Sequence, residues 1–149
     1  MPMKKFKFSL DSVLSYKQQV LDALKGEHAA ILMRVREQEE RLEAVWQEYR
    51  GYDAEYTRRK AEGITISDAM IYQGGLRALE RDIQRETDRL EELRKQEEAK
   101  RQEVIDAKID TSSLEKLKEK KLDLYNKAVQ KSEENLIDEF VSSRRRIGA

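Results

Sequence analysis

The chain has 149 residues, of which 40% are charged, compared with about 25% in an average globular domain. Its 30 basic and 30 acidic residues give a formal net charge of zero, so no overall attraction to nucleic acid is expected. Cysteine is absent, which excludes a disulfide framework and thiolate chemistry. With aromatic residues at only 7%, the apolar content suits a narrow stripe along helices better than a thick core.

The N-terminus, "MPMKKFKFSL", is basic but lacks the apolar stretch of a secretory signal. The longest apolar run, "AAILM", is far shorter than the roughly 20 residues that span a bilayer. We therefore expect a soluble, intracellular chain with no transmembrane segment of its own.

Apolar residues alternate in steps of four and three from Leu10 to Tyr56, which predicts a first helix over about residues 9–61. Fourteen positions share this frame, and eleven of them are apolar or aromatic. A frame held for almost seven heptads is typical of a coiled coil, and such a helix needs a partner along its stripe. The predicted seam is Leu10, Leu14, Leu21, Leu24, Ile31, Val35, Leu42, Val45, Tyr49, Tyr52 and Tyr56.

Three positions in the same frame are polar: Lys17, His28 and Gln38. Polar seam residues usually fix register or partner choice at some cost in stability. His28 is the only histidine, and without a second histidine or a cysteine it is better explained as a structural residue than as a metal ligand or a catalytic base.

The stretch "AEGITISDAMIYQGG" predicts a helix stop, a loop over about residues 62–67 and a new helix start. Gly63 suits the left-handed position that ends a helix. Thr65 suits the N-cap of the next helix, with Asp68 completing an imperfect capping box. A phosphate-binding loop is excluded because the G-x-x-x-x-G-K-[ST] spacing is missing. The stretch therefore predicts the turn of an αα-hairpin.

A second helix is predicted over about residues 68–144, and two heptad helices joined by a short loop should pack antiparallel. Gly74 and Gly75 lie inside it, and each costs about 1 kcal/mol relative to Ala. They indicate either close packing or a tolerated weak point, or else a bend or a bare docking surface near the turn. The seam of this helix is Ala69, Tyr72, Leu76, Leu79, Ile83, Glu86, Leu90 and Leu93.

Residues 94–103, "RKQEEAKRQE", contain no large apolar side chain, so pairing should be weak or splayed there. Beyond them Ser112 and Glu115 form a capping-box pattern, and the apolar residues change frame. We interpret this as a stutter or kink near Asp110–Ser113. The alternative is a full break into a third helix.

The predicted fold is a single all-α domain, a long antiparallel two-helix coiled-coil hairpin whose C-terminal helix is the longer. Antiparallel pairing places Leu10 opposite roughly residue 118, so residues beyond about 120 should lack an intrachain partner. They nevertheless carry an apolar stripe, which implies a second copy, a groove in another protein or the central hole of a ring. The stripe is Leu122, Tyr125, Val129, Leu136 and Phe140.

Three segments together resemble the FliJ family, the small coiled-coil component of the flagellar type III protein-export apparatus. "FKFSLDSVLSYKQQ" is similar to the opening of that family, and "KEKKLDLYNKAVQKSEENLIDEF" to its Lys-Glu-rich end. "GITISDAMIYQGGLRALERDIQ" is similar to its central pattern of Gly, a short polar cap, Tyr-Gln-Gln-Phe and a Leu-Glu-rich helix. Here Gly74 and Gly75 replace the Gln-Phe of that pattern, which affects any contact made by the missing aromatic.

The resemblance implies a non-enzymatic, cofactor-free stalk and adaptor, cytoplasmic and peripheral at the membrane. The end with both termini would enter the hexameric export ATPase through the stripe that begins at Leu122. The stalk would also contact the cytoplasmic domain of the export gate, and some export chaperones, near the hairpin turn. The residues implied there are Tyr72, Gln73, Leu76, Leu79 and Ile83.

Two other classes of function remain alternatives. One is a scaffold that self-associates, weakly or stably, through the C-terminal stripe; the stalk protein of an injectisome is a close variant of the main hypothesis. The other is membrane binding by the helix that ends in "SRRRIGA", which interleaved Glu and Asp residues oppose. Nucleic-acid binding and catalysis are disfavoured, since no stacking platform, Ser-His pair or metal-ligand cluster is present.

Overall fold

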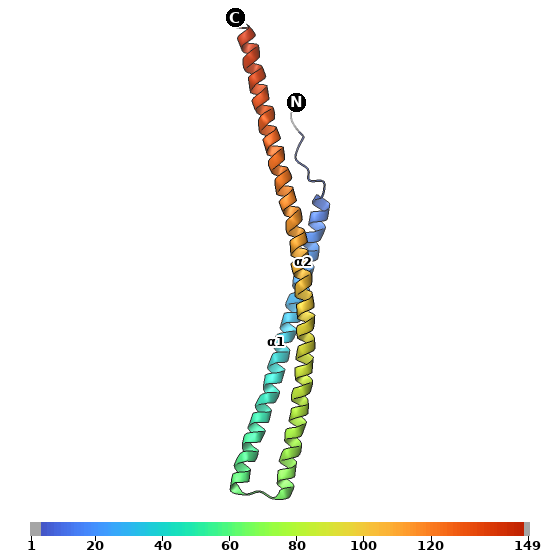
Figure 1. The fold of residues 1–149 in the computed structure, drawn as a ribbon, viewed down its shortest axis with the longest axis vertical. Helices are drawn as coiled ribbons and strands as arrows, with labels where there is room; N and C mark the ends of the chain where they lie inside the picture. Colours follow the sequence, from blue (N-terminus) through green and yellow to red (C-terminus); the bar gives the residue numbers. More distant parts are fainter. Residues whose placement is uncertain (1–3, 148–149) are drawn as a thin grey trace. The chain divides into compact units, whose positions relative to one another are not determined.

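A computed structural model describes residues 4–147 and contains two helices, α1 (Asp11–Glu62) and α2 (Ile66–Ile147), with no strand in the described range. The helices pack against each other (Figure 1), which confirms the all-α prediction. Contacts divide the chain into two units. The hairpin unit is Ala23–Val104, and the terminal unit is Met1–Asp22 with Ile105–Ala149, of which residues 4–22 and 105–147 are described.

The turn between the helices follows the predicted chemistry over a shorter loop. α1 ends at Glu62, and Gly63 follows with a φ of 98°, a conformation that favours glycine. The backbone N–H of Asp68 donates to Thr65 Oγ1 at 3.1 Å, which makes Thr65 the N-cap. Because the cap is Thr65, α2 begins at Ile66, two residues before the predicted start.

The hairpin unit is antiparallel, and its interior is the predicted stripe of side chains. Val35 and Tyr56 of α1 are buried, as are Tyr72, Ile83 and Leu90 of α2. Most other stripe positions are half-buried, as expected for an interface between only two helices: Leu24, Ile31, Leu42, Val45, Tyr49, Tyr52, Ala69, Leu76, Leu79 and Leu93.

Polar residues of the stripe meet polar partners across the hairpin unit. The side-chain amide of Gln38, only 2% exposed, donates to the backbone carbonyl of Glu86 at 3.0 Å and to its carboxylate. His28 Nε2 lies 2.9 Å from Glu97 Oε1. These pairs satisfy groups that would be costly to bury alone.

The stretch without large apolar residues, 94–103, is bridged to α1 by charge. Lys100 Nζ lies 2.9 Å from Glu27 Oε2, and also 2.8 Å from Glu103 of its own helix. Hydrogen bonds to Glu103 and then to Glu27 raise the pKa of Lys100. Ionic contacts therefore replace apolar contacts in residues 94–103, where the seam has no large apolar side chain.

α2 passes through Asp110–Ser113 as continuous helix, so the alternative of a third helix is wrong. Ser112 caps no helix start, and Thr111 is buried, its hydroxyl donating to the carbonyl of Ala107 at 2.8 Å. A polar residue thus occupies the seam without interrupting it. The frame holds through Lys118, and the predicted change of frame near Asp110–Ser113 does not occur; the positions in frame are Ala107, Thr111, Leu114 and Lys118.

In the terminal unit, residues 4–8 form a non-helical segment that we call the strap, which packs on α2. Phe8 is buried, and the Phe6 and Tyr125 ring centroids lie 5.7 Å apart. Tyr125 Oη donates to the backbone carbonyl of Lys4 at 2.5 Å. The expectation that residues beyond about 120 lack an intrachain partner is therefore wrong at Tyr125, because the non-helical strap extends the pairing past the start of α1.

Gly75 is a site of close packing in the hairpin unit, whereas Gly74 is not. A Cβ added at Gly75 would lie 2.5 Å from Cε1 and 2.7 Å from Oη of Tyr52. The Tyr52 ring is itself held against Tyr72, with centroids 5.0 Å apart. Nothing lies within 4 Å of the corresponding Cβ position at Gly74. The packing interpretation of the glycine pair therefore holds for Gly75 alone.

The two glycines should respond oppositely to alanine. Gly74→Ala should stabilise the protein by about 1 kcal/mol, because alanine favours helix and meets open space. Gly75→Ala should not increase the free energy of unfolding. The Tyr52 ring must leave its contact with Tyr72, a pair that contributes about 0.5–1.5 kcal/mol, and this loss offsets the gain in helix propensity. Urea denaturation followed by circular dichroism measures both, and equal stabilisation by the two variants would contradict the packing role of Gly75.

Gln38 should contribute more to stability than its polarity suggests. Gln38→Ala should cost about 2 kcal/mol, because it removes a buried donor to a charged group and leaves the Glu86 oxygens without it. Gln47→Ala, at an exposed position of the same helix, is the matched control and should change stability by less than about 0.5 kcal/mol. The same denaturation experiment compares them, and similar losses in both would contradict this assignment.

Candidate partner-binding surfaces

The C-terminal segment of α2, residues 133–147, is the most exposed helical segment of the terminal unit. Every described residue after Ser132 is exposed, whereas Tyr125 and Val129 just before it are half-buried. In Figure 1 this part of α2 continues beyond the strap. It bears an exposed apolar surface of Leu136, Ile137, Phe140 and Val141, and Ile147 is exposed about two turns further on.

The predicted ATPase-end residues fall into two groups. Leu136 and Phe140 are 52% and 65% exposed and lie one turn apart on residues 133–147, which we call the bare segment. Leu122 is also exposed but lies among the residues level with the strap, as does half-buried Tyr125. Sequence reasoning missed Ile137 and Val141, although their i, i+4 spacing beside the first pair signals a wider stripe.

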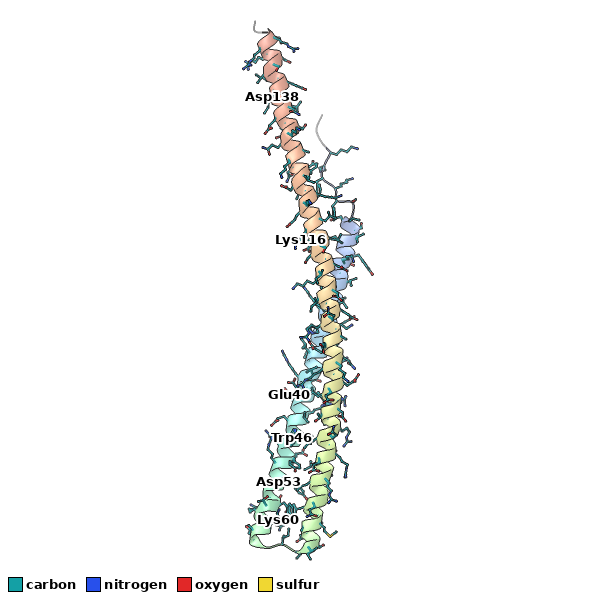
Figure 2. All side chains as sticks on the ribbon, in the orientation of Figure 1. Glu40, Trp46, Asp53, Lys60, Lys116 and Asp138 are labelled. Carbon is teal, nitrogen blue, oxygen red and sulfur yellow. The ribbon has the colours of Figure 1, made fainter. Side chains whose placement is uncertain are left out.

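Charges divide the end of α2 into short bands. Residues 116–131 contain six lysines and two acidic residues, and residues 133–139 contain four acidic residues and no basic one. Arg144, Arg145 and Arg146 follow. Figure 2 shows side chains, Asp138 among them, projecting around the helix. A partner that contacts this segment must therefore complement charge as well as apolar surface.

The predicted gate-contact residues lie mostly inside the hairpin unit. Tyr72 and Ile83 are buried, and Leu76 and Leu79 are half-buried against α1. Only Gln73 is exposed, and its side-chain amide donates to Tyr56 Oη at 3.3 Å. The structure thus brings the five residues together chiefly as packing, with Gln73 at the rim.

Tyr72 organises the packing near the turn. Its ring stacks on Tyr56 with centroids 5.2 Å apart, and its hydroxyl donates to Glu55 Oε1 at 3.0 Å. Arg59 donates to the same hydroxyl at 3.2 Å, and this hydrogen bond raises the pKa of Arg59. Lys60 Nζ, labelled in Figure 2, lies 4.2 Å from the Tyr56 ring centroid. This network holds the first turns of α2 against the last turns of α1.

An exposed apolar patch, Ile66, Met70 and Ile71, lies beside this network at the start of α2. Gly74, one turn after Met70, adds no side chain to cover it. We call these three residues the tip patch. The sequence contained a signal for it, because all three are large apolar residues outside the three-four frame of the seam.

Chemistry-bearing clusters are absent from residues 4–147. No group of three or more His, Asp or Glu side chains in this range is arranged to hold a metal ion. Within the same range, neither helix has a stretch long and apolar enough to cross a lipid bilayer. His28, the only histidine, is engaged with Glu97 as described above.

Comparison with known proteins identifies the family of this chain. The sequence model of the family described as "FliJ: Flagellar FliJ protein" matches residues 6–146. Searches of curated proteins and of solved structures each returned no significant match. The family is one of flagellar export components without catalytic activity. Since the match covers nearly the whole chain, the protein belongs to the FliJ family of the flagellar export apparatus.

Proposed function

We propose that this protein is the coiled-coil stalk and adaptor of the flagellar type III export ATPase complex. The end that bears both termini would insert into the hexameric ATPase, and the hairpin turn would reach the cytoplasmic domain of the export gate. The protein would then act in the cytoplasm, peripherally at the membrane through the apparatus. Family membership supports the export role, and two exposed surfaces support these specific contacts.

The observation that carries the ATPase contact is the bare segment of α2, residues 133–147. Its apolar residues are exposed, whereas the three-four stripe of the hairpin unit is buried or half-buried. Continuous apolar surface on a water-soluble helix marks an interaction site. The surface covers one broad face of the helix, from Leu136 and Phe140 to Ile137 and Val141, so a partner can contact all four side chains from one side.

For the gate contact, and for any contact with export chaperones, the accessible surface is Gln73 together with the tip patch. Tyr72, Leu76, Leu79 and Ile83 would act by holding this surface rather than by touching the partner, since they pack against α1. The replacement of an aromatic by Gly75 then has a local cause, because Tyr52 occupies the space beside it.

Self-association is the second candidate function, favoured by the same exposed stripe. Two copies could bury Leu136 and Phe140 against each other as a short coiled coil. Light scattering distinguishes the two functions. The scaffold is favoured if the protein forms a stable dimer at micromolar concentration and Leu136→Asp dissociates it. The stalk is favoured if the protein is a monomer that stimulates the ATPase.

Mutation of the bare segment tests the stalk. Leu136→Asp with Phe140→Asp should abolish stimulation of hydrolysis and ring assembly by the cognate ATPase, because two charges enter an apolar contact. The fold should be unaffected, since both side chains are exposed. ATPase assays and electron microscopy of rings provide the measurements.

The matched control places the same charges elsewhere on α2. Ile105→Asp with Ile109→Asp alters residues that are 42% and 60% exposed and lie outside the bare segment. This variant should stimulate the ATPase like the wild type. A wild-type chain without effect on the ATPase, or equal loss in both variants, would contradict the stalk function.

The tip patch should mediate gate binding. Met70→Asp should weaken binding to the isolated cytoplasmic gate domain by roughly tenfold or more, the effect of losing one buried apolar side chain at an interface. Met33→Asp is the matched control, because Met33 and Met70 are 63% and 66% exposed on the two helices of the hairpin unit. Calorimetric titration measures both, and an unchanged affinity for Met70→Asp would rule out the patch.

A further inference from the structure

The strap presents lysines from a fixed backbone. Phe8 is buried and Phe6 is half-buried against Tyr125, while Tyr125 Oη holds the Lys4 carbonyl. At the start of α1, the Asp11 N–H donates to the Phe8 carbonyl at 3.1 Å, and the Asp11 carboxylate pairs with Lys118 of α2 at 2.8 Å. The segment is thus attached to α2 at both of its ends.

Three lysines alternate with these apolar anchors. Lys4, Lys5 and Lys7 are exposed, and with Phe6 and Tyr125 they line an open groove of about 910 Å³. Lys121 lies on α2 one turn before Tyr125, on the same side of the helix, and is also exposed. Among the described residues none of these four lysines forms an ion pair with another side chain.

We propose that this strap groove binds an acidic protein segment. Exposed lysines carried on an anchored backbone around an aromatic pair raise the local positive potential, and an incoming carboxylate would relieve it. The exposed faces of Phe6 and Tyr125 offer apolar contact for the methylene groups of the acidic side chains in such a segment. Building on the proposed stalk function, the acidic segment belongs to the ATPase, at the level where the bare segment of α2 enters it.

An anionic membrane fits the same groove less well. The acidic band of residues 133–139 begins about two helical turns after Tyr125 and carries Glu133, Glu134, Asp138 and Glu139. A lipid surface broad enough to meet the strap lysines would also approach these carboxylates and be repelled by them. A protein loop can reach the groove alone, which favours a partner with localised negative charge.

Charge reversal in the strap tests the proposal directly. Lys4→Glu with Lys7→Glu should weaken binding of a fluorescent poly-glutamate peptide roughly tenfold, as expected for the loss of two partly exposed charge contacts. The matched control is Lys25→Glu with Lys95→Glu, which makes the same change of charge at exposed lysines of the hairpin unit and should bind like the wild type. Lys4→Gln with Lys7→Gln should give a smaller loss.

The ATPase assay separates this proposal from the stalk function. The strap variant should need roughly tenfold more protein for half-maximal stimulation, and wild-type stimulation should weaken with added salt more steeply than that of the variant. If Leu136→Asp with Phe140→Asp abolishes stimulation and the strap variant behaves like the wild type, the strap proposal fails alone. If the wild type does not stimulate at all, the stalk function fails, and peptide binding still decides whether the groove takes an acidic segment.

Binding to vesicles provides the opposing arm. The proposal would be overturned in favour of a lipid headgroup by two results together. The wild type would float with phosphatidylserine vesicles and Lys4→Glu with Lys7→Glu would not, and the wild type would show no binding of poly-glutamate. Poly-glutamate binding that is equal in the strap variant and the control would overturn it as well. Circular dichroism of each variant confirms that the helices are intact.

Discussion

Apart from the contact between the strap and α2, each helix of this protein can remove apolar surface from water only along the stripe that faces the other helix. Within residues 4–147 no large side chain is completely buried, and the buried apolar residues of the two helices recur at the three-four spacing of a two-helix interface. Hydrophobic stabilisation is therefore spread thinly along α1 and α2 rather than concentrated in a core. Most of the surface of both helices remains in contact with water, so function must depend on which exposed patches depart from the charged background.

Polar residues of the stripe fit this constraint because each finds a polar partner in the opposite helix. Gln38 meets Glu86, and His28 meets Glu97. An apolar residue opposite Gln38 would leave its amide unsatisfied, so a slip of one heptad would cost free energy at this position as well as apolar contact. The polar pairs thus select one register among several that the repeating apolar pattern alone would allow.

The features predictable from the sequence are those with a local or periodic origin. The frame from Leu14 to Tyr56 depends only on spacing, and the turn depends on the left-handed glycine and the cap at Thr65. The predicted change of frame near Thr111 was wrong because spacing arguments treat a polar residue as a gap, whereas a hydroxyl can bond to its own helix and occupy the interior.

Contacts that depend on three-dimensional proximity were beyond sequence reasoning. The strap has no helical period, so no pattern in its sequence predicts that Phe6 contacts Tyr125, which lies 119 positions further along the chain. The need for glycine at position 75 arises from the ring of Tyr52, which only the antiparallel register brings close. Among the candidate sites, the apolar stripe at the end of α2 was partly found, whereas the tip patch lay outside the frame and was overlooked.

The bare segment of α2 gains from being continuous with a packed helix. An isolated helix of this length is marginal in water, because its first turn fixes several residues for a single hydrogen bond, with a nucleation constant of about 10⁻³. Residues 133–147 avoid that step, since the turns before them are held by the strap and by α1. Exposed apolar residues such as Phe140 are therefore presented in helical form at little cost in nucleation. A partner that binds them loses less free energy to ordering than it would with a disordered tail.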